Sequence, residues 1–220
     1  MHKQTTREME QARNLFRNGP IPKDGLAALD AETERLAAIK LAERALLRGA
    51  VAPDFILPDA QGRPVRLYSL LRDGPVVVVF YRGGWCPFCK VYLRGFQRRR
   101  RELKALGAQV VAISPQLPDH SLSTRETGKL KYTVLSDVGN KIAHKFGLVV
   151  RLNDPLLKVY ESFGVSLKEV NGKDGAAELP VPATFVINTN GVVRRSHVDG
   201  DFTRRLDPDD VVEEIKKLQN

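Results

Sequence analysis

The sequence predicts an α/β fold with a central mixed sheet flanked by helices, preceded by a helical N-terminal extension over residues 1–48. The apolar run at residues 76–81 is typical of a strand buried on both faces of a sheet. A helix and a second apolar strand, residues 109–114, follow it, which indicates a β-α-β unit with parallel strands. Residues 183–198 read as two strands joined by an Asn-Gly turn, so an antiparallel pair completes the mixed sheet.

The N-terminal extension is expected to form two helices. Thr5 and Glu8 have the spacing of a capping box, and apolar residues then recur on one face up to the "GPIP" at residues 19–22. A second helix is predicted from about residue 26 to residue 47. No catalytic pattern occurs here, so we interpret the extension as an accessory arm that packs on the main domain or on another subunit, which leaves a homodimer open.

The main domain, residues 49–220, continues the alternation of strands and helices. Asp207 is suited to cap the last helix and Pro208 to occupy its first position. No pattern predicts the structure of residues 150–180. The other elements expected are a hairpin at residues 54–67, a helix from the cysteines to about residue 106, a helix near residues 119–128 and a strand at residues 133–135.

Composition favours a soluble globular protein, with 42% apolar and 28% charged residues. The longest apolar run, at residues 76–81, is far shorter than the roughly 18 residues of a membrane span. The first residues are polar and lack the apolar core of a secretory signal. We therefore expect no membrane association and a cytoplasmic location.

The formal charge of +9 is concentrated in one segment. Residues 82–104 contain eight Lys or Arg and one acidic residue, and they include the run Arg98 to Arg101. A nucleic-acid binder would combine such a patch with aromatic residues or a recognisable module, and neither a zinc-finger spacing nor an RNA-recognition pattern is present. A solvated basic helix face is the favoured interpretation, and a nucleic-acid partner is disfavoured.

The two cysteines of the chain, Cys86 and Cys89, lie in "WCPFC". A C-x-x-C spacing in a reducing compartment indicates redox chemistry or a metal site. The four histidines show no paired spacing of the kind that structural zinc sites use, so we expect no metal and no cofactor. Two inert buried cysteines are the remaining alternative, which the position at a strand-to-helix junction disfavours.

Pro87 is suited to the first turn of a helix, which places Cys86 at the cap and Cys89 one turn deeper. A Cys86 thiolate there could accept hydrogen bonds from the amides of Phe88 and Cys89 at the positive end of the helix. Such an environment lowers the pKa of a thiol. We therefore predict that Cys86 is the nucleophile and that Cys89 attacks it once it has been oxidised.

Four residues before Cys86 complete the candidate site. Arg82 is the cation best placed to activate Cys86, unless it only forms an ion pair on the surface. Gly83 and Gly84 let the backbone approach a small ligand closely. Trp85 either lines a substrate surface or is a plain packing residue.

Several motifs together resemble the peroxiredoxin-like branch of the AhpC/TSA family, over about residues 50–218. They are "VVVVFYRGGWCPFC", "VVAIS" as the next strand and "VPATFVINTNGVV" near the end. The resemblance implies a thioredoxin-like fold, a thiol-dependent antioxidant oxidoreductase and a hydroperoxide substrate. It also implies a thioredoxin- or glutathione-type reductant.

The sequence departs from the family pattern at three positions. Where peroxiredoxins carry a proline and a threonine before the reactive cysteine, this chain has Val79 and Gly83. Where they carry an arginine near the late strand, it has Pro182. Since the threonine and the arginine orient the peroxide, the resemblance implies slower peroxide reduction. Pro182 matches instead the cis-proline that faces the C-x-x-C pair in thioredoxins, so we expect a cis bond there.

Three functions are therefore open. In a peroxidase, Cys86 attacks a peroxide, becomes a sulfenic acid and is resolved by Cys89. In a thiol-disulfide oxidoreductase, Cys86 attacks a protein or small-molecule disulfide through a mixed intermediate. In a binding module, the basic helix makes the contacts and the cysteines are incidental.

Overall fold

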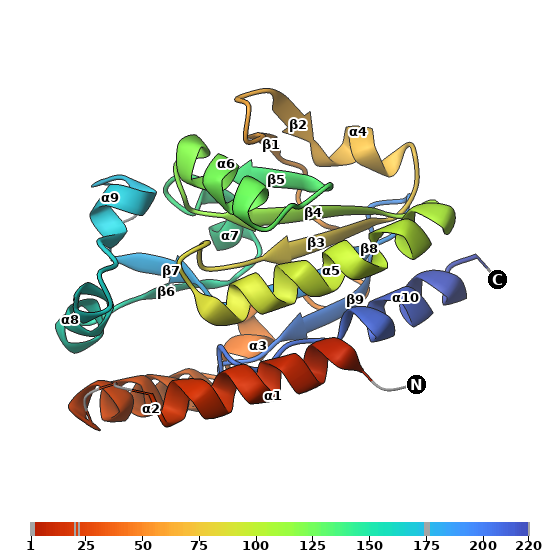
Figure 1. The fold of residues 1–220 in the computed structure, drawn as a ribbon. Helices are drawn as coiled ribbons and strands as arrows, with labels where there is room; N and C mark the ends of the chain where they lie inside the picture. Colours follow the sequence, from red (N-terminus) through yellow and green to blue (C-terminus); the bar gives the residue numbers. More distant parts are fainter. Residues whose placement is uncertain (1–2, 20, 22, 174–176, 220) are drawn as a thin grey trace.

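The computed structural model describes residues 3–19, 21, 23–173 and 177–219. At its centre lies a five-stranded sheet in the order β5-β4-β3-β8-β9 (Figure 1). Strand β3 pairs in parallel with β4 and antiparallel with β8, so the sheet is mixed and β3 is central, as predicted. The strands are β3 (Val76–Phe80), β4 (Gln109–Ser114), β5 (Thr133–Ser136), β8 (Ala183–Ile187) and β9 (Val193–Val198).

Around the sheet, the predicted hairpin and the helices predicted after the cysteines, near residues 119–128 and after Asp207 are present, whereas the other helices of the main domain had no prediction. None of the described helices is long and apolar enough to cross a membrane. Strands β1 (Ile56–Pro58) and β2 (Pro64–Arg66) form the expected hairpin. The helices of the main domain are α4 (Leu67–Leu71), α5 (Pro87–Ala105), α6 (Pro118–Thr127), α7 (Lys141–Lys145), α8 (Asp154–Ser162), α9 (Leu167–Asn171) and α10 (Pro208–Lys217).

Strand β3 divides the core into two layers because its side chains alternate between the faces of the sheet. Val77 and Val79 pack in the cluster that contains the apolar residues of α5 and α10. Val76 and Val78 pack in the cluster on the opposite face, which includes residues of α4 and α7. Every residue of β3 is buried, which confirms the interpretation of the valine run.

The first helix of the extension, α1 (Gln4–Arg17), is not capped as the sequence predicted. Thr5 is a buried residue inside the first turn, and no side chain caps the helix. The Thr5 hydroxyl instead accepts a hydrogen bond from Arg98 on α5 at 3.1 Å, and the Glu8 carboxylate pairs with the same guanidinium at 2.8 Å. The capping-box prediction was wrong because both side chains are used between helices.

The second predicted helix is two helices, α2 (Lys23–Ala38) and α3 (Leu41–Arg44). Between them Lys40 has a left-handed backbone with φ of 49°. The break allows Leu41 to pack with Val150 and Val181 of the main domain. No glycine or proline marks this position, so the sequence contained no signal for it.

The extension packs on its own main domain, where α1 runs along α5 and lies below α5 and α10 in the view of Figure 1. The amide and hydroxyl of Thr6 both donate to Asp207, the residue that caps α10 as predicted. A Cβ atom on Gly95 of α5 would lie 2.6 Å from the Thr5 hydroxyl, so the close approach of α1 requires glycine there. Arg99 joins α5 to α10 through Asp209 at 2.5 Å, so part of the arginine run is structural rather than a solvated face.

Of residues 150–180, whose structure no sequence pattern predicted, the described part lies beside the start of α5. Strands β6 (Val149–Arg151) and β7 (Glu178–Pro180) pair antiparallel, and helices α8 and α9 lie between them in the chain. Asn153 caps helix α8, and its side chain accepts a hydrogen bond from the Leu156 amide. Its C-terminal part carries Tyr160 toward the start of α5.

Candidate active site

The two cysteines lie at the start of α5, as predicted. Cys86 is the N-cap residue and Pro87 takes the first helical position. Both cysteines are free thiols and belong to the buried cluster between α5 and the sheet. Cys86 lines a cavity with 2% of its surface exposed, whereas Cys89 is fully buried. Access to solvent and ligands therefore favours Cys86.

Each of the two thiols acts on the pKa of the other. Burial raises the pKa of Cys86 well above its ordinary value, and its side chain makes no capping hydrogen bond. Burial acts in the same direction at Cys89, but the hydrogen bond from Cys86 and the charges of Arg205 and Arg82 outweigh it and lower the pKa of Cys89 to about 5. The directions of these pKa shifts favour a thiolate on Cys89, whereas the helix-start argument favours one on Cys86, so the assignment of the nucleophile stays a prediction.

Arg82 is not a surface residue. It is 5% exposed, and within the described residues no carboxylate lies within ion-pair distance of it. Its guanidinium donates to the Tyr160 hydroxyl and lies over three rings, at 5.1 Å from the centre of Trp85, 5.0 Å from that of Tyr160 and 4.5 Å from that of Phe202. The ring faces stabilise the cation without neutralising it, so its charge stays available to the thiols.

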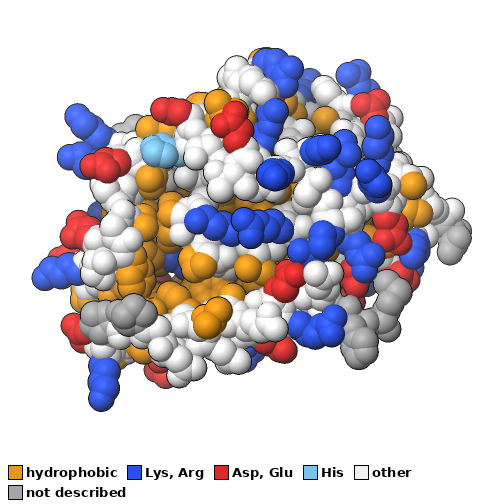
Figure 2. Space-filling view, in the orientation of Figure 1, with side chains coloured by type: hydrophobic (Ala, Val, Ile, Leu, Met, Phe, Trp, Pro, Cys, Tyr) orange, Lys and Arg blue, Asp and Glu red, His pale blue; other side chains and the backbone are white. Residues whose placement is uncertain are grey.

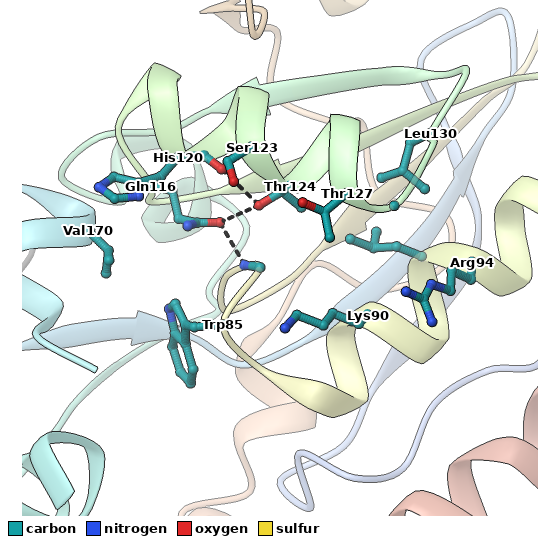
Figure 3. Close-up of a pocket in the computed structure, with 13 residues that line it drawn as sticks. Trp85, Lys90, Arg94, Gln116, His120, Ser123, Thr124, Thr127, Leu130 and Val170 are labelled. Atoms are coloured by element: carbon teal, nitrogen blue, oxygen red, sulfur yellow. Dashed lines mark hydrogen bonds between the residues drawn. The ribbon is translucent and has the colours of Figure 1, made fainter. Parts of the chain in front are cut away.

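The backbone between Arg82 and Cys86 is held within the fold. The Gly84 amide donates to the Gln116 side chain at 2.7 Å, and Thr124 donates to the same oxygen at 3.2 Å (Figure 3). The Gly84 amide is therefore paired within the fold, and the approach of a small ligand to the backbone of Gly83 and Gly84 stays a prediction. A Cβ atom on Gly83 would lie 2.2 Å from the Nε1 atom of the Trp85 indole. The absence of a side chain at Gly83 therefore leaves room for the tryptophan.

Trp85 is half-buried between two cavities. Its ring packs edge-on against Tyr160 with 5.4 Å between the centres. The first cavity, about 230 Å³, has both polar and apolar walls and lies between α5, which contributes Lys90 and Arg94, and α6, which contributes Thr127 (Figure 3). The second contains Cys86. Trp85 thus forms part of the wall that separates them.

Pro182 is buried at the start of β8, but the cis prediction was wrong. No cis peptide bond occurs in the part of the chain that the structure describes. The amide of Val181 donates to the Leu148 carbonyl at 2.8 Å, which holds the segment extended between β7 and β8. The trans peptide bond before Pro182 keeps the backbone extended from β7 into β8.

The cavity around Cys86 has a volume of about 580 Å³. The polar residues of its lining are few and include Cys86, Arg82, Tyr160 and Ser162. The rest of the wall is mainly apolar and comes from α1, α2, α8 and the loop before α10. The apolar wall residues include Ala12, Leu15, Phe16, Leu29, Phe163 and Phe202.

Sequence reasoning missed four contributors to this site: Phe16, Tyr160, Phe202 and Arg205. Phe16 and Phe202 pack edge-on against Phe88, with 5.3 and 5.6 Å between ring centres. Arg205 lies near enough to Cys89 for its charge to lower the pKa of that thiol. All four are distant from the cysteines in sequence, and no local spacing marks them.

No cluster of three or more metal-ligating side chains occurs among the described residues. The ionisable groups that act on the two sulfurs among the described residues are the cations Arg82 and Arg205 and the hydroxyls of Tyr81 and Tyr160. This is an environment for a thiolate and for an anionic leaving group.

Comparison with known proteins agrees with this geometry. The AhpC/TSA family matches residues 48–196. The chloroplastic peroxiredoxin Q of Sedum lineare is 30% identical over 171 residues, which are 78% of this chain and 76% of that protein. That of Oryza sativa subsp. japonica is 30% identical over 184 residues, 81% of this chain and 72% of that protein.

Solved structures show the same fold. Peroxidoxin BcpB from Mycobacterium tuberculosis superposes with a TM-score of 0.62 and 25% identity, over 79% of this chain and 98% of that one. The reduced 2-Cys peroxiredoxin of Plasmodium vivax has a TM-score of 0.61 at 17% identity, over 79% and 82% of the two chains. With its C-x-x-C pair at the start of α5 and its thioredoxin-like sheet, the chain therefore belongs to the AhpC/TSA family, as a peroxiredoxin-like member.

Proposed function

We propose that this thiol-dependent oxidoreductase reduces hydroperoxides with Cys86 as the nucleophile and Cys89 as the resolving thiol. The observation that carries the proposal is Arg82, a buried guanidinium that shares the cavity with Cys86. Peroxide reduction expels an oxyanion, and a buried positive charge stabilises such an anion strongly. Family membership and the peroxiredoxin Q relatives support the same activity.

The interaction between the two thiols offers a route by which the buried pair can react. Transfer of the Cys86 proton to Cys89 leaves the thiolate on the sulfur that lines the cavity. This thiolate attacks the terminal oxygen of the hydroperoxide, the O–O bond breaks, and the leaving alkoxide takes up a proton from solvent water to become an alcohol. Cys86 is then a sulfenic acid. Cys89 attacks it, water leaves, and an intramolecular disulfide forms.

Arg82 acts at the breaking bond in this scheme. Its charge is directed into the cavity by the Tyr160 hydroxyl and by the three rings around it. It thereby takes the part of the arginine that the family carries near the late strand, where this chain has Pro182. The Gly84 amide is occupied by Gln116, so Arg82 is the principal donor proposed for the oxyanion.

The catalytic cycle closes when an external thiol reduces the disulfide. We propose a thioredoxin- or glutathione-type reductant, which supplies two electrons and two protons by thiol-disulfide exchange. A reducing compartment such as the cytoplasm fits a pair of free thiols. Trapping the thiols with an alkylating agent in intact cells tests this location, since a stably oxidised pair would contradict it.

The test is a titration of the reduced protein with one equivalent of hydrogen peroxide. We expect rapid loss of two thiols per peroxide, no reaction in Cys86→Ser, and a dimedone-reactive sulfenic acid in Cys89→Ser. A protein that leaves peroxide untouched and readily reduces the disulfides of insulin would be a thiol-disulfide oxidoreductase instead.

A further inference from the structure

The cavity around Cys86 is far larger than hydrogen peroxide requires. Its volume of about 580 Å³ falls in the range of pockets that hold small organic molecules, roughly 300–1,000 Å³. Its wall has the same character as such pockets, with a few polar groups at one place and apolar side chains elsewhere. Three of the polar lining residues, Cys86, Arg82 and Tyr160, are those that the peroxide group itself would meet.

The N-terminal extension supplies one wall of this cavity. Ala12, Leu15 and Phe16 of α1 and Leu29 of α2 line it opposite the residues of α8 and its following loop. In Figure 2, apolar side chains gather in the hollow between α1 and α5 and continue toward α8. Leu15 and Phe163 are 76% and 39% exposed, so the apolar surface extends to the outside of the cavity.

This wall is held in place by specific contacts and is not part of the family match, which begins at residue 48. Thr6 donates twice to Asp207, and Arg98 bonds Thr5 and Glu8. Phe16 packs edge-on against Phe88, two residues after Cys86. The arm is thus fixed against the helix that carries the reactive thiol.

We infer that the N-terminal arm is a specificity element that selects hydroperoxides with a bulky apolar substituent over hydrogen peroxide. This inference rests on the proposed function. The peroxide group lies at Cys86 and Arg82, and the substituent occupies the space between Ala12, Phe16 and Phe163. An apolar substituent is favoured because that part of the wall offers it surface to bury and no charge.

The test compares cumene hydroperoxide with hydrogen peroxide in matched variants. Ala12→Phe narrows the cavity, and Gln11→Phe places the same ring on an exposed neighbour that does not line it. We expect Ala12→Phe to lower the ratio of kcat/KM for cumene hydroperoxide to that for hydrogen peroxide by about tenfold or more, the effect of misfit in an apolar pocket. Gln11→Phe should leave this ratio unchanged.

Leu15→Asp is a second variant that is not expected to impair folding, because the Leu15 side chain is 76% exposed and its replacement disturbs little packing. It should lower the same ratio by placing a negative charge beside the apolar substituent. An equal ratio in wild type, Ala12→Phe and Leu15→Asp would overturn the inference and leave the peroxidase intact. If these two variants instead changed only the rate at which the external thiol reduces the disulfide, the cavity would be a binding site for the reductant.

Binding can be measured without turnover. Trp85 is the only tryptophan of the chain and lines the cavity, so its fluorescence reports on occupancy. We expect cumyl alcohol, the unreactive product, to change this fluorescence saturably in the reduced protein, and at higher concentration in Ala12→Phe than in Gln11→Phe. No saturable change would contradict the inference. If the wild type reduces neither peroxide, the proposed function fails together with it.

Discussion

The guanidinium of Arg82 donates a hydrogen bond to the hydroxyl of Tyr160 and lies 5.0 Å from the centre of its ring. Tyr160 comes from α8, in the segment whose structure the sequence did not predict. Because the Tyr160 hydroxyl is neutral, this hydrogen bond holds the guanidinium of Arg82 in position without neutralising its positive charge. Burying an unpaired charge is costly, and such an arrangement is typical of functional sites.

We predict that Arg82→Gln lowers kcat/KM for hydroperoxides by a factor of about 10² to 10³, as for removal of an oxyanion donor. Tyr160→Phe is the matched control, because it keeps the ring and removes only the hydroxyl that Arg82 contacts. Its loss should be smaller, about tenfold or less. Steady-state assays of both variants check this, and a loss below about threefold in Arg82→Gln would remove Arg82 from the mechanism.

The thiol pair should react with alkylating agents at unusually low pH. The pKa of Cys89 is lowered to about 5 by the hydrogen bond from Cys86 and by two arginines, against the effect of burial. We expect the alkylation rate of the reduced protein to rise with a midpoint near pH 5, with the label on the accessible Cys86. Peptide mass spectrometry over pH 4 to 9 measures both. A midpoint near the ordinary cysteine value, about 8.5, would contradict the predicted charge.

Arg205 acts on the pair from its other side. It lowers the pKa of Cys89, and its guanidinium lies 5.9 Å from the ring centre of Tyr92. We predict that Arg205→Gln shifts the alkylation midpoint upward, whereas Arg204→Gln leaves it in place, because Arg204 is exposed and paired with Asp201 at 3.3 Å. Equal midpoints in the two variants would show that Arg205 has no electrostatic role.

Stability of the reduced protein should follow the same titration. Because the pKa of Cys89 is lower in the folded state than in the unfolded chain, its thiolate stabilises the fold at pH values above about 5, and this contribution is lost as the pH falls through that value. The free energy of unfolding should therefore rise from pH 5 to about pH 8, and Cys89→Ser should flatten the rise. Above that range the raised pKa of Cys86 opposes further gain. Urea unfolding under reducing conditions measures the profile.

The sheet and the start of α5 could be predicted because local patterns determine them. The valine run of β3 needs burial on both faces, and Pro87 has a defined place in a helix. The break at Lys40 could not be predicted, because a left-handed residue there is favoured only by the burial of Leu41 against the main domain.

The cysteine pair was predictable as a site, but its surroundings were not. Tyr160, Phe202 and Phe16 reach Arg82 and Phe88 from three separate segments. Their contacts arise only when α1 and α8 pack beside α5. For the same reason the arm appeared to be an accessory in the sequence, although it lines the cavity of Cys86.

Gly84 offers a test of how the loop before Cys86 is held. Its amide donates to Gln116 at 2.7 Å, and a Cβ atom would lie 2.1 Å from the Thr124 hydroxyl oxygen. We predict that Gly84→Ala lowers the free energy of unfolding by about 1 to 3 kcal/mol, the usual cost of overpacking. Because the clash is with one side chain, Thr124→Ala should recover part of this loss in the double variant. Strictly additive effects of the two substitutions in urea unfolding would mean that Thr124 is not what excludes a side chain at this position.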